Sequence, residues 1–171
     1  MFKQMAKERR TIRSYTNQIA SYETIRDIAQ TALYAPTGRN IQHVEMFITR
    51  DKAKLKKLAY AKPQWGEFVE DADFAIIIAA DANKNPNTYI EDATFVASYL
   101  KLAAHEHGIA SCWVHIRTAE HESKISSSDY IKKEFGIDDK FTIECVLAFG
   151  YPNEEPRRQE FGSFDDFVHF I

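Results

Sequence analysis

The segment YIEDATFVASYLKLAAHEHGIASCW, residues 89–113, decides how the rest of the chain must be arranged. Apolar residues recur in it at helical spacing and also cover much of the remaining helix surface. The residues at helical spacing form one apolar stripe, which consists of Ile90, Ala93, Val96, Ala97, Leu100 and Ala104. The helix surface beside this stripe carries Phe95, Tyr99, Leu102 and Ala103. A helix that is apolar nearly all round lies in a core or at an interface. Gly108 ends this helix, and residues 109–116 predict a strand directly after it.

Outward from this segment, helical and strand patterns alternate along the whole chain. Further helices are expected from Ser21 to Pro36, from Asp51 through Leu58 and from Ser126 to Phe135, and strands over residues 44–49, 74–80 and 141–149. The run Phe74 to Ala80 is continuously apolar, which is typical of a strand buried on both faces. This alternation predicts an α/β or α+β fold around one sheet.

The composition fits one globular domain and excludes several functional classes. The chain has 171 residues, of which 22 are basic and 25 acidic, so its formal net charge is −3. So small a charge favours neither nucleic acid nor a membrane surface as a partner. No apolar run approaches the roughly 20 residues of a membrane span. The basic start from Met1 to Arg13 lacks the apolar stretch of a signal peptide, so a cytoplasmic protein is expected.

Cysteine, histidine and glycine usage excludes further kinds of site. Two cysteines, Cys112 and Cys145, form no disulfide framework, and the six histidines show no spacing suited to a metal ion. No metal site is therefore expected. The six glycines fit neither a dinucleotide-binding fingerprint nor a phosphate loop.

A basic cluster near the start, Arg9-Arg10-Thr11-Ile12-Arg13, is the first candidate binding segment. Three guanidinium groups and a hydroxyl within five residues suit a phosphate, whose oxygens arginine donors match in pairs. If this segment is helical, Arg9 and Arg13 share a face. The alternative interpretation is an ordinary solvated basic start.

Two later segments are also candidates. Residues 35–42, Ala-Pro-Thr-Gly-Arg-Asn-Ile-Gln, form a loop rich in amide and hydroxyl groups that suits the polar edge of a heterocycle. An equally good interpretation of this loop is an ordinary turn, in which the polar side chains form hydrogen bonds with their own backbone. Residues 108–113 leave the long helix through small side chains, which allows a flat ligand close to the backbone. Cys112 and Trp113 also suit simple core packing.

Taken in chain order, four motifs resemble the nitroreductase family of FMN-dependent oxidoreductases. The family pattern R-R-S-x-R-x-[FY] is matched by residues 9–15, with Thr11 in place of serine, and A-P-S-x-x-N-x-Q is matched by residues 35–42. The central pattern D-A … L-x-L-A-A-x-x-x-G-[LI]-[GA]-[ST]-x-W is matched by Asp92-Ala93 and residues 100–113. The closing G-Y-P-x-E-x-P is matched by residues 150–156.

The resemblance implies an α+β fold with a central, mostly antiparallel sheet flanked by helices, in an intertwined homodimer with FMN in each of two interface clefts. It implies one domain over residues 1–171, with residues 157–171 as a C-terminal arm packing on the partner subunit. Phe161, Phe164, Phe167, Phe170 and Ile171 make this arm too apolar to remain in water.

The same resemblance implies the residues that bind the cofactor. The basic cluster would grip the flavin phosphate, the loop would approach the flavin from the partner subunit, and the residues after Cys112 would line the ring. Many family members add a late basic pair, for which Arg157 is the candidate here. The expected cofactor-binding residues are Arg9, Arg10, Thr11, Arg13, Pro36, Thr37, Asn40, Gln42, Trp113, Val114, His115 and Arg157.

The implied activity is that of an FMN-dependent NAD(P)H oxidoreductase. It would take hydride from NADH or NADPH and reduce a second small molecule, such as a nitroaromatic or a quinone, by a ping-pong mechanism. The flavin carries this chemistry, so no general acid is required, and His115 is the one candidate proton source. The alternatives are a flavin-binding sensor or storage module, an enone reductase or dehalogenase on the same fold, and an interaction domain with no cofactor.

Overall fold

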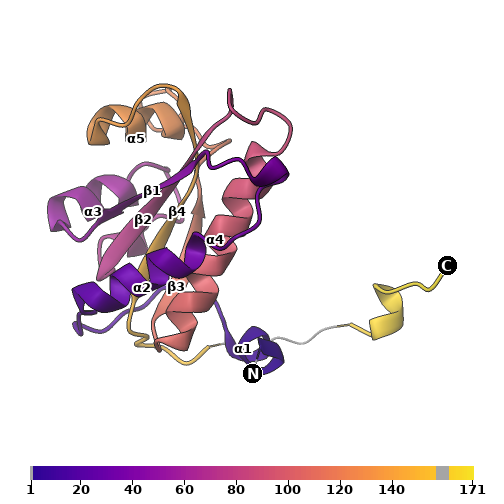
Figure 1. The fold of residues 1–171 in the computed structure, drawn as a ribbon. Coiled ribbons are helices and arrows are strands. Elements are labelled where there is room, and N and C mark those ends of the chain that lie inside the picture. The colour runs from indigo at the N-terminus through magenta and orange to yellow at the C-terminus, as the bar shows by residue number, and fades with distance from the viewer. Residues whose placement is uncertain (1, 157–161) are drawn as a thin grey trace.

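The computed structural model describes residues 2–156 and 162–171 of the chain (Figure 1). The described residues form a four-stranded sheet in which every neighbouring pair of strands is antiparallel. The strands are β1 (Val44–Thr49), β2 (Phe74–Asp81), β3 (Ala110–His115) and β4 (Phe141–Gly150), in the order β1-β2-β4-β3. The predicted α+β fold with an antiparallel central sheet is therefore confirmed.

Five α-helices accompany the sheet in the described part of the chain. They are α1 (Phe2–Glu8), α2 (Tyr22–Ala32), α3 (Lys52–Ala59), α4 (Tyr89–Glu106) and α5 (Ser127–Phe135), with short 3-10 turns at Gly38–Asn40, Glu67–Val69 and Phe164–Asp166. The side chains of Ser21 and Asp51 accept hydrogen bonds from the first turns of α2 and α3, as N-caps do. None of these helices is both long enough and apolar enough to cross a membrane.

The sheet is covered by helices on both faces. In Figure 1, α2 and α4 lie together across one face, and their apolar sides pack on Phe74, Ile76 and Ile78 of β2. The helices α3 and α5 pack on the opposite face, where the alternate β2 residues Ala75 and Ile77 point. This two-sided burial explains why β2 is continuously apolar, since successive side chains of a strand point to opposite faces.

Apolar side chains of α4 and of the C-terminal segment remain exposed among the described residues. The inner stripe of α4 is buried against the sheet, but Phe95 on its outer side is 47% exposed. Residues 162–171 stand away from the sheet and its helices (Figure 1), with Phe167 74% and Phe170 92% exposed. The first part of the expected arm, residues 157–161, lies outside the described residues.

Candidate functional site

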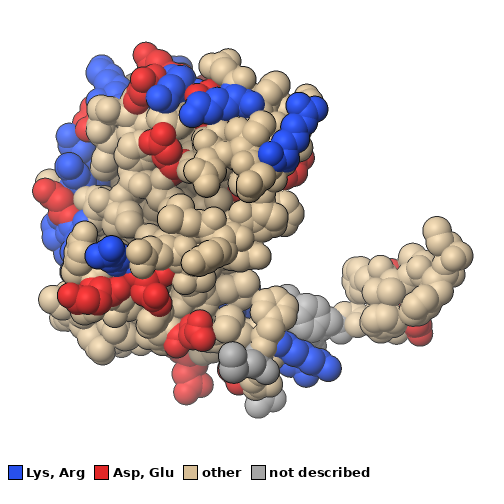
Figure 2. All heavy atoms as spheres, in the orientation of Figure 1, with Lys and Arg blue, Asp and Glu red and all other residues tan. Residues whose placement is uncertain are grey.

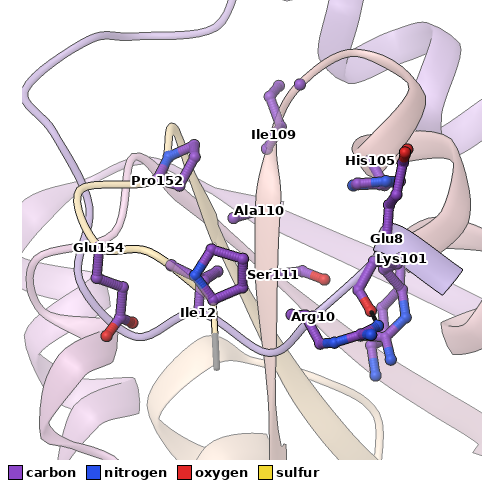
Figure 3. Close-up of a pocket in the computed structure, with 13 residues that line it drawn as sticks. Glu8, Arg10, Ile12, Lys101, His105, Ile109, Ala110, Ser111, Pro152 and Glu154 are labelled. Carbon is purple, nitrogen blue, oxygen red and sulfur yellow. Dashed lines mark hydrogen bonds between the residues drawn. The ribbon is translucent and has the colours of Figure 1, made fainter. Parts of the chain in front are cut away.

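A pocket of about 240 Å³ lies where residues 9–12 run along the start of β3, beside the C-terminal end of α4 (Figure 3). Its polar lining includes Glu8, Arg9, Arg10, Lys101, His105 and Glu154. Thr11 forms a parallel bridge with Ser111 of β3, and Tyr15 pairs with Pro152. These bridges hold the segment after α1 against the edge of the sheet.

Neither arginine of this pocket is paired with a carboxylate in the part of the chain that the structure describes. The Nη1 atom of Arg9 is buried without a hydrogen-bond partner, and Nη1 of Arg10 donates to the backbone oxygen of Arg9 at 2.7 Å. Among the described residues, the arginines in ion pairs are Arg50 and Arg117. Burial lowers the pKa of Arg9, and the neighbouring charge of Arg10 lowers it further. Uncompensated cations in a partly buried pocket favour an anion there.

Lys101 is a third cation of the pocket, and the sequence interpretation did not include it. Burial lowers the pKa of its ammonium group, and the charge of Arg9 lowers it further. Figure 3 shows Lys101 on the same side of the pocket as Arg10. One sequence signal indicates it, because Lys101 is the only lysine or arginine within α4.

Arg13 and Thr11 do not line this pocket, because the basic cluster is not helical. The helix α1 ends at Glu8, and the bridged segment that follows is not helical. Four residues of extended chain span roughly 13 Å, against about 6 Å in a helix, so Arg9 and Arg13 are not stacked on one helical face. Arg13 instead places its guanidinium 5.8 Å from the ring centre of Phe68.

Residues 113–115 form the end of β3, an edge strand of the sheet. His115 is half-buried, and its Nε2 atom lies 2.9 Å from the hydroxyl of Thr118. On its other side, Nδ1 lies 3.9 Å from Oε1 of the buried Glu144. Glu144 also accepts a hydrogen bond at 2.8 Å from Nε of Arg117. The sequence interpretation missed this carboxylate, although a glutamate inside the apolar strand β4 marks an unusual position.

The loop 36–42 is held at the N-terminal end of α4. The backbone nitrogen of Gly38 donates to Oδ1 of Asp92 at 2.9 Å, and Oδ2 of the same buried carboxylate accepts from Asn85 and Thr88, each at 2.9 Å. A Cβ atom on residue 38 would clash with Oγ1 of Thr88 and with Nδ2 of Asn85, so a larger residue there would displace these side chains from Asp92. The predicted site residues of this loop remain accessible: Pro36, Asn40 and Gln42 are exposed, and Thr37 is half-buried.

The structure does not bring the loop and the basic pocket together within one chain. The loop is tied to Asp92 and the pocket is lined by His105, so they lie about 20 Å apart along α4 at 1.5 Å per residue. The pocket is also smaller than the roughly 300–1,000 Å³ of typical ligand sites. A complete site for a large ligand therefore needs surface beyond these residues.

One predicted cofactor-binding residue, Arg157, falls on the part of the chain that the structure does not describe. No group of three or more histidine, cysteine or acidic side chains within residues 2–156 and 162–171 is arranged to hold a metal ion.

Comparison with known proteins gives a consistent result over most of the chain. The family model described as the nitroreductase family matches residues 6–65 and 58–151. An Archaeoglobus fulgidus protein with the provisional name NADH dehydrogenase/NAD(P)H nitroreductase is 29% identical over 161 residues, which are 92% of this chain and 87% of the relative.

Solved structures extend this similarity to the three-dimensional fold. An FMN-dependent nitroreductase from Clostridium difficile R20291 superposes with a TM-score of 0.92 and 34% identity, covering 97% of this chain and 96% of the other. A Desulfovibrio desulfuricans protein, provisionally called a nitroreductase and solved in complex with FMN, shares the fold with a TM-score of 0.83 and 21% identity, covering 99% of this chain and 95% of the other.

Proposed function

Because the chain belongs to the nitroreductase family, we propose that it is an FMN-dependent oxidoreductase that takes hydride from NADH or NADPH and reduces a second small molecule, such as a nitroaromatic or a quinone, in a ping-pong mechanism. Bound FMN would supply the hydride acceptance and the onward transfer of electrons. The protein's own residues bind and orient it and exclude water.

The observation that carries this proposal is the buried, unpartnered Nη1 atom of Arg9. Arginine donors fit phosphate oxygens closely, and the pocket places Arg10 beside Arg9 with no carboxylate paired to either among the described residues. The donor set therefore fits the phosphate end of a flavin nucleotide. The name of the 34% identical Clostridium difficile protein supports FMN as that nucleotide.

The proposal includes a homodimer with the cofactor at the interface. The pocket and the loop 36–42 occupy opposite ends of α4, so one copy would supply the pocket and its partner the loop to the same flavin. Figure 2 shows few charged side chains on the middle of the face that α2 and α4 form. Phe95 of α4 and the two residues directly after α2, Leu33 and Tyr34, are exposed. Residues 1–171 would form one domain, with residues 157–171 as an arm on the partner.

The end of β3 is proposed to lie beside the flavin ring. Backbone N–H groups at Val114 and His115 would stabilise negative charge on the reduced ring. His115 would hold a proton there, and Glu144 would fix the orientation of its imidazole from the other side.

An anaerobic visible spectrum of the purified protein with added FMN, before and after NADH or NADPH, tests this function. We expect bands of bound flavin that bleach when the nicotinamide is added. Bands that persist would instead support a sensor or storage module. Absence of bound flavin would contradict the proposal.

A further inference from the structure

Lys101 shares one face of α4 with His105, since the two residues are one helical turn apart and both line the pocket. Arg9 and Arg10, which follow α1, line the same pocket, and Figure 3 shows Arg10 there. Two elements that are far apart in the sequence thus bring three cationic side chains together in about 240 Å³.

The carboxylates that line the pocket are engaged elsewhere. Glu8 accepts a hydrogen bond from the side chain of Gln4. Glu154 accepts from the backbone nitrogens of Arg13 and Ser14 at 2.6 and 3.1 Å. Within residues 2–156 and 162–171, neither carboxylate forms an ion pair with Lys101, Arg9 or Arg10. Burial and the charge of Arg9 both disfavour the charged form of Lys101, which lowers its pKa.

Grouping these cations without a fixed counter-ion costs free energy in the ligand-free protein. A ligand with one negative charge would offset only part of that cost. A phosphate monoester carries a charge of about −1.5 to −2 near neutral pH and offers three acceptor oxygens, so it matches three cationic donors.

We infer that Lys101 binds the phosphate of FMN directly, as a third cation beside Arg9 and Arg10. This inference rests on the proposed function and adds a binding residue to it. In the ligand-free protein Lys101 is a source of repulsion, and in the complex it is a source of affinity. Lys101 therefore lowers the stability of the ligand-free protein and raises its affinity for FMN. A residue with a structural role alone would not show this pair of opposite effects.

Comparison of FMN with riboflavin tests the inference, since riboflavin has the same ring and ribityl chain but no phosphate. Binding of each flavin would be titrated by fluorescence to wild-type protein, Lys101→Met and Lys101→Arg. We expect Lys101→Met to weaken FMN binding by at least about tenfold, the effect of losing one charge-assisted contact, and to leave riboflavin binding unchanged. Lys101→Arg should retain most of the FMN affinity.

Thermal unfolding of the ligand-free variants provides the second measurement. Lys101→Met should be at least as stable as the wild type, because it removes a desolvated charge. Lys133→Met is the matched control, since it removes the same charge from an exposed position of α5 and should change neither flavin affinity nor stability.

The possible results separate the inference from the proposed function. Equal losses for FMN and riboflavin, or no loss for either, would show that Lys101 does not bind the phosphate. Equal affinity of the wild type for both flavins would overturn the inference and leave the flavin enzyme standing. A wild type that binds neither flavin would remove both.

Discussion

Arg9 and Arg13 belong to one sequence motif but occupy different surroundings. Arg9 has a buried guanidinium nitrogen without a partner, whereas Arg13 lies over the ring of Phe68. We expect Arg9→Met to weaken FMN binding by about 1.5–3 kcal/mol, the range for a hydrogen bond to a charged group, with riboflavin binding unchanged. Isothermal titration with both flavins measures this.

Arg13→Met serves as the matched comparison at the same scale. Because Arg13 does not line the pocket, its loss should show no preference for FMN over riboflavin. If Arg13→Met lost affinity for FMN but not for riboflavin, and Arg9→Met lost neither, then Arg13 and not Arg9 would be the residue that binds the phosphate.

The difference between these residues marks the limit of sequence reasoning at the scale of single side chains. The arginines of the basic cluster predicted an anion-binding site, and the positions of Arg9 and Arg10 suit such a site. Lys101 could not be grouped with them, because it is 92 positions after Arg9 and joins it only through the packing of α1 and α4. Glu144 approaches His115 only through the pairing of β3 with β4.

At the scale of elements, α4 holds the loop 36–42 through one carboxylate. Asp92 is buried and accepts hydrogen bonds from Gly38, Asn85 and Thr88. We expect Asp92→Ala to lower the free energy of unfolding by about 1.5–3 kcal/mol, because these donors lose their acceptor. It should also weaken flavin retention by releasing the loop. Urea denaturation and flavin titration measure the two effects.

Glu91→Ala is the control for this prediction. Glu91 is exposed in the same helical turn, so its loss should cost less than about 1 kcal/mol through the helix dipole alone. Equal destabilisation by both variants would show that Asp92 acts only as a helix-terminal charge.

Most elements were predictable because their signals are local. The helices expected to begin near Ser21, Asp51 and Ser126 and the continuous apolar run of β2 are confirmed. The helix α1 was not predicted: it is only seven residues long, and none of its residues is buried. The extended course of residues 9–15 depends on bridges to Ser111 and Pro152, which no local pattern reveals.

At the scale of the whole molecule, the exposed aromatic side chains of residues 162–171 bear on the assembly. We expect removal of residues 161–171 to weaken the proposed homodimer and its retention of FMN, by about tenfold or more, since each buried large side chain contributes about 1.5–3 kcal/mol. Sedimentation across a concentration series measures the dimer. Phe2→Ser, which removes an exposed aromatic near the other terminus, should leave it unchanged. If the truncated protein dimerises as strongly as the full chain, the arm packs only on its own subunit.

The placement of the pocket and the loop at opposite ends of α4 has a genetic consequence. In the proposed dimer, one copy supplies the basic pocket of each cofactor cleft and the other copy supplies the loop. The variant Arg9→Met damages only the pocket, and the double variant Asn40→Ala with Gln42→Ala damages only the loop. Random assembly of the two makes half of the dimers mixed, each with one intact and one doubly damaged cleft, so about one cleft in four is whole. Two alleles that each fail alone should complement one another when co-expressed, and flavin content of the mixture would show it.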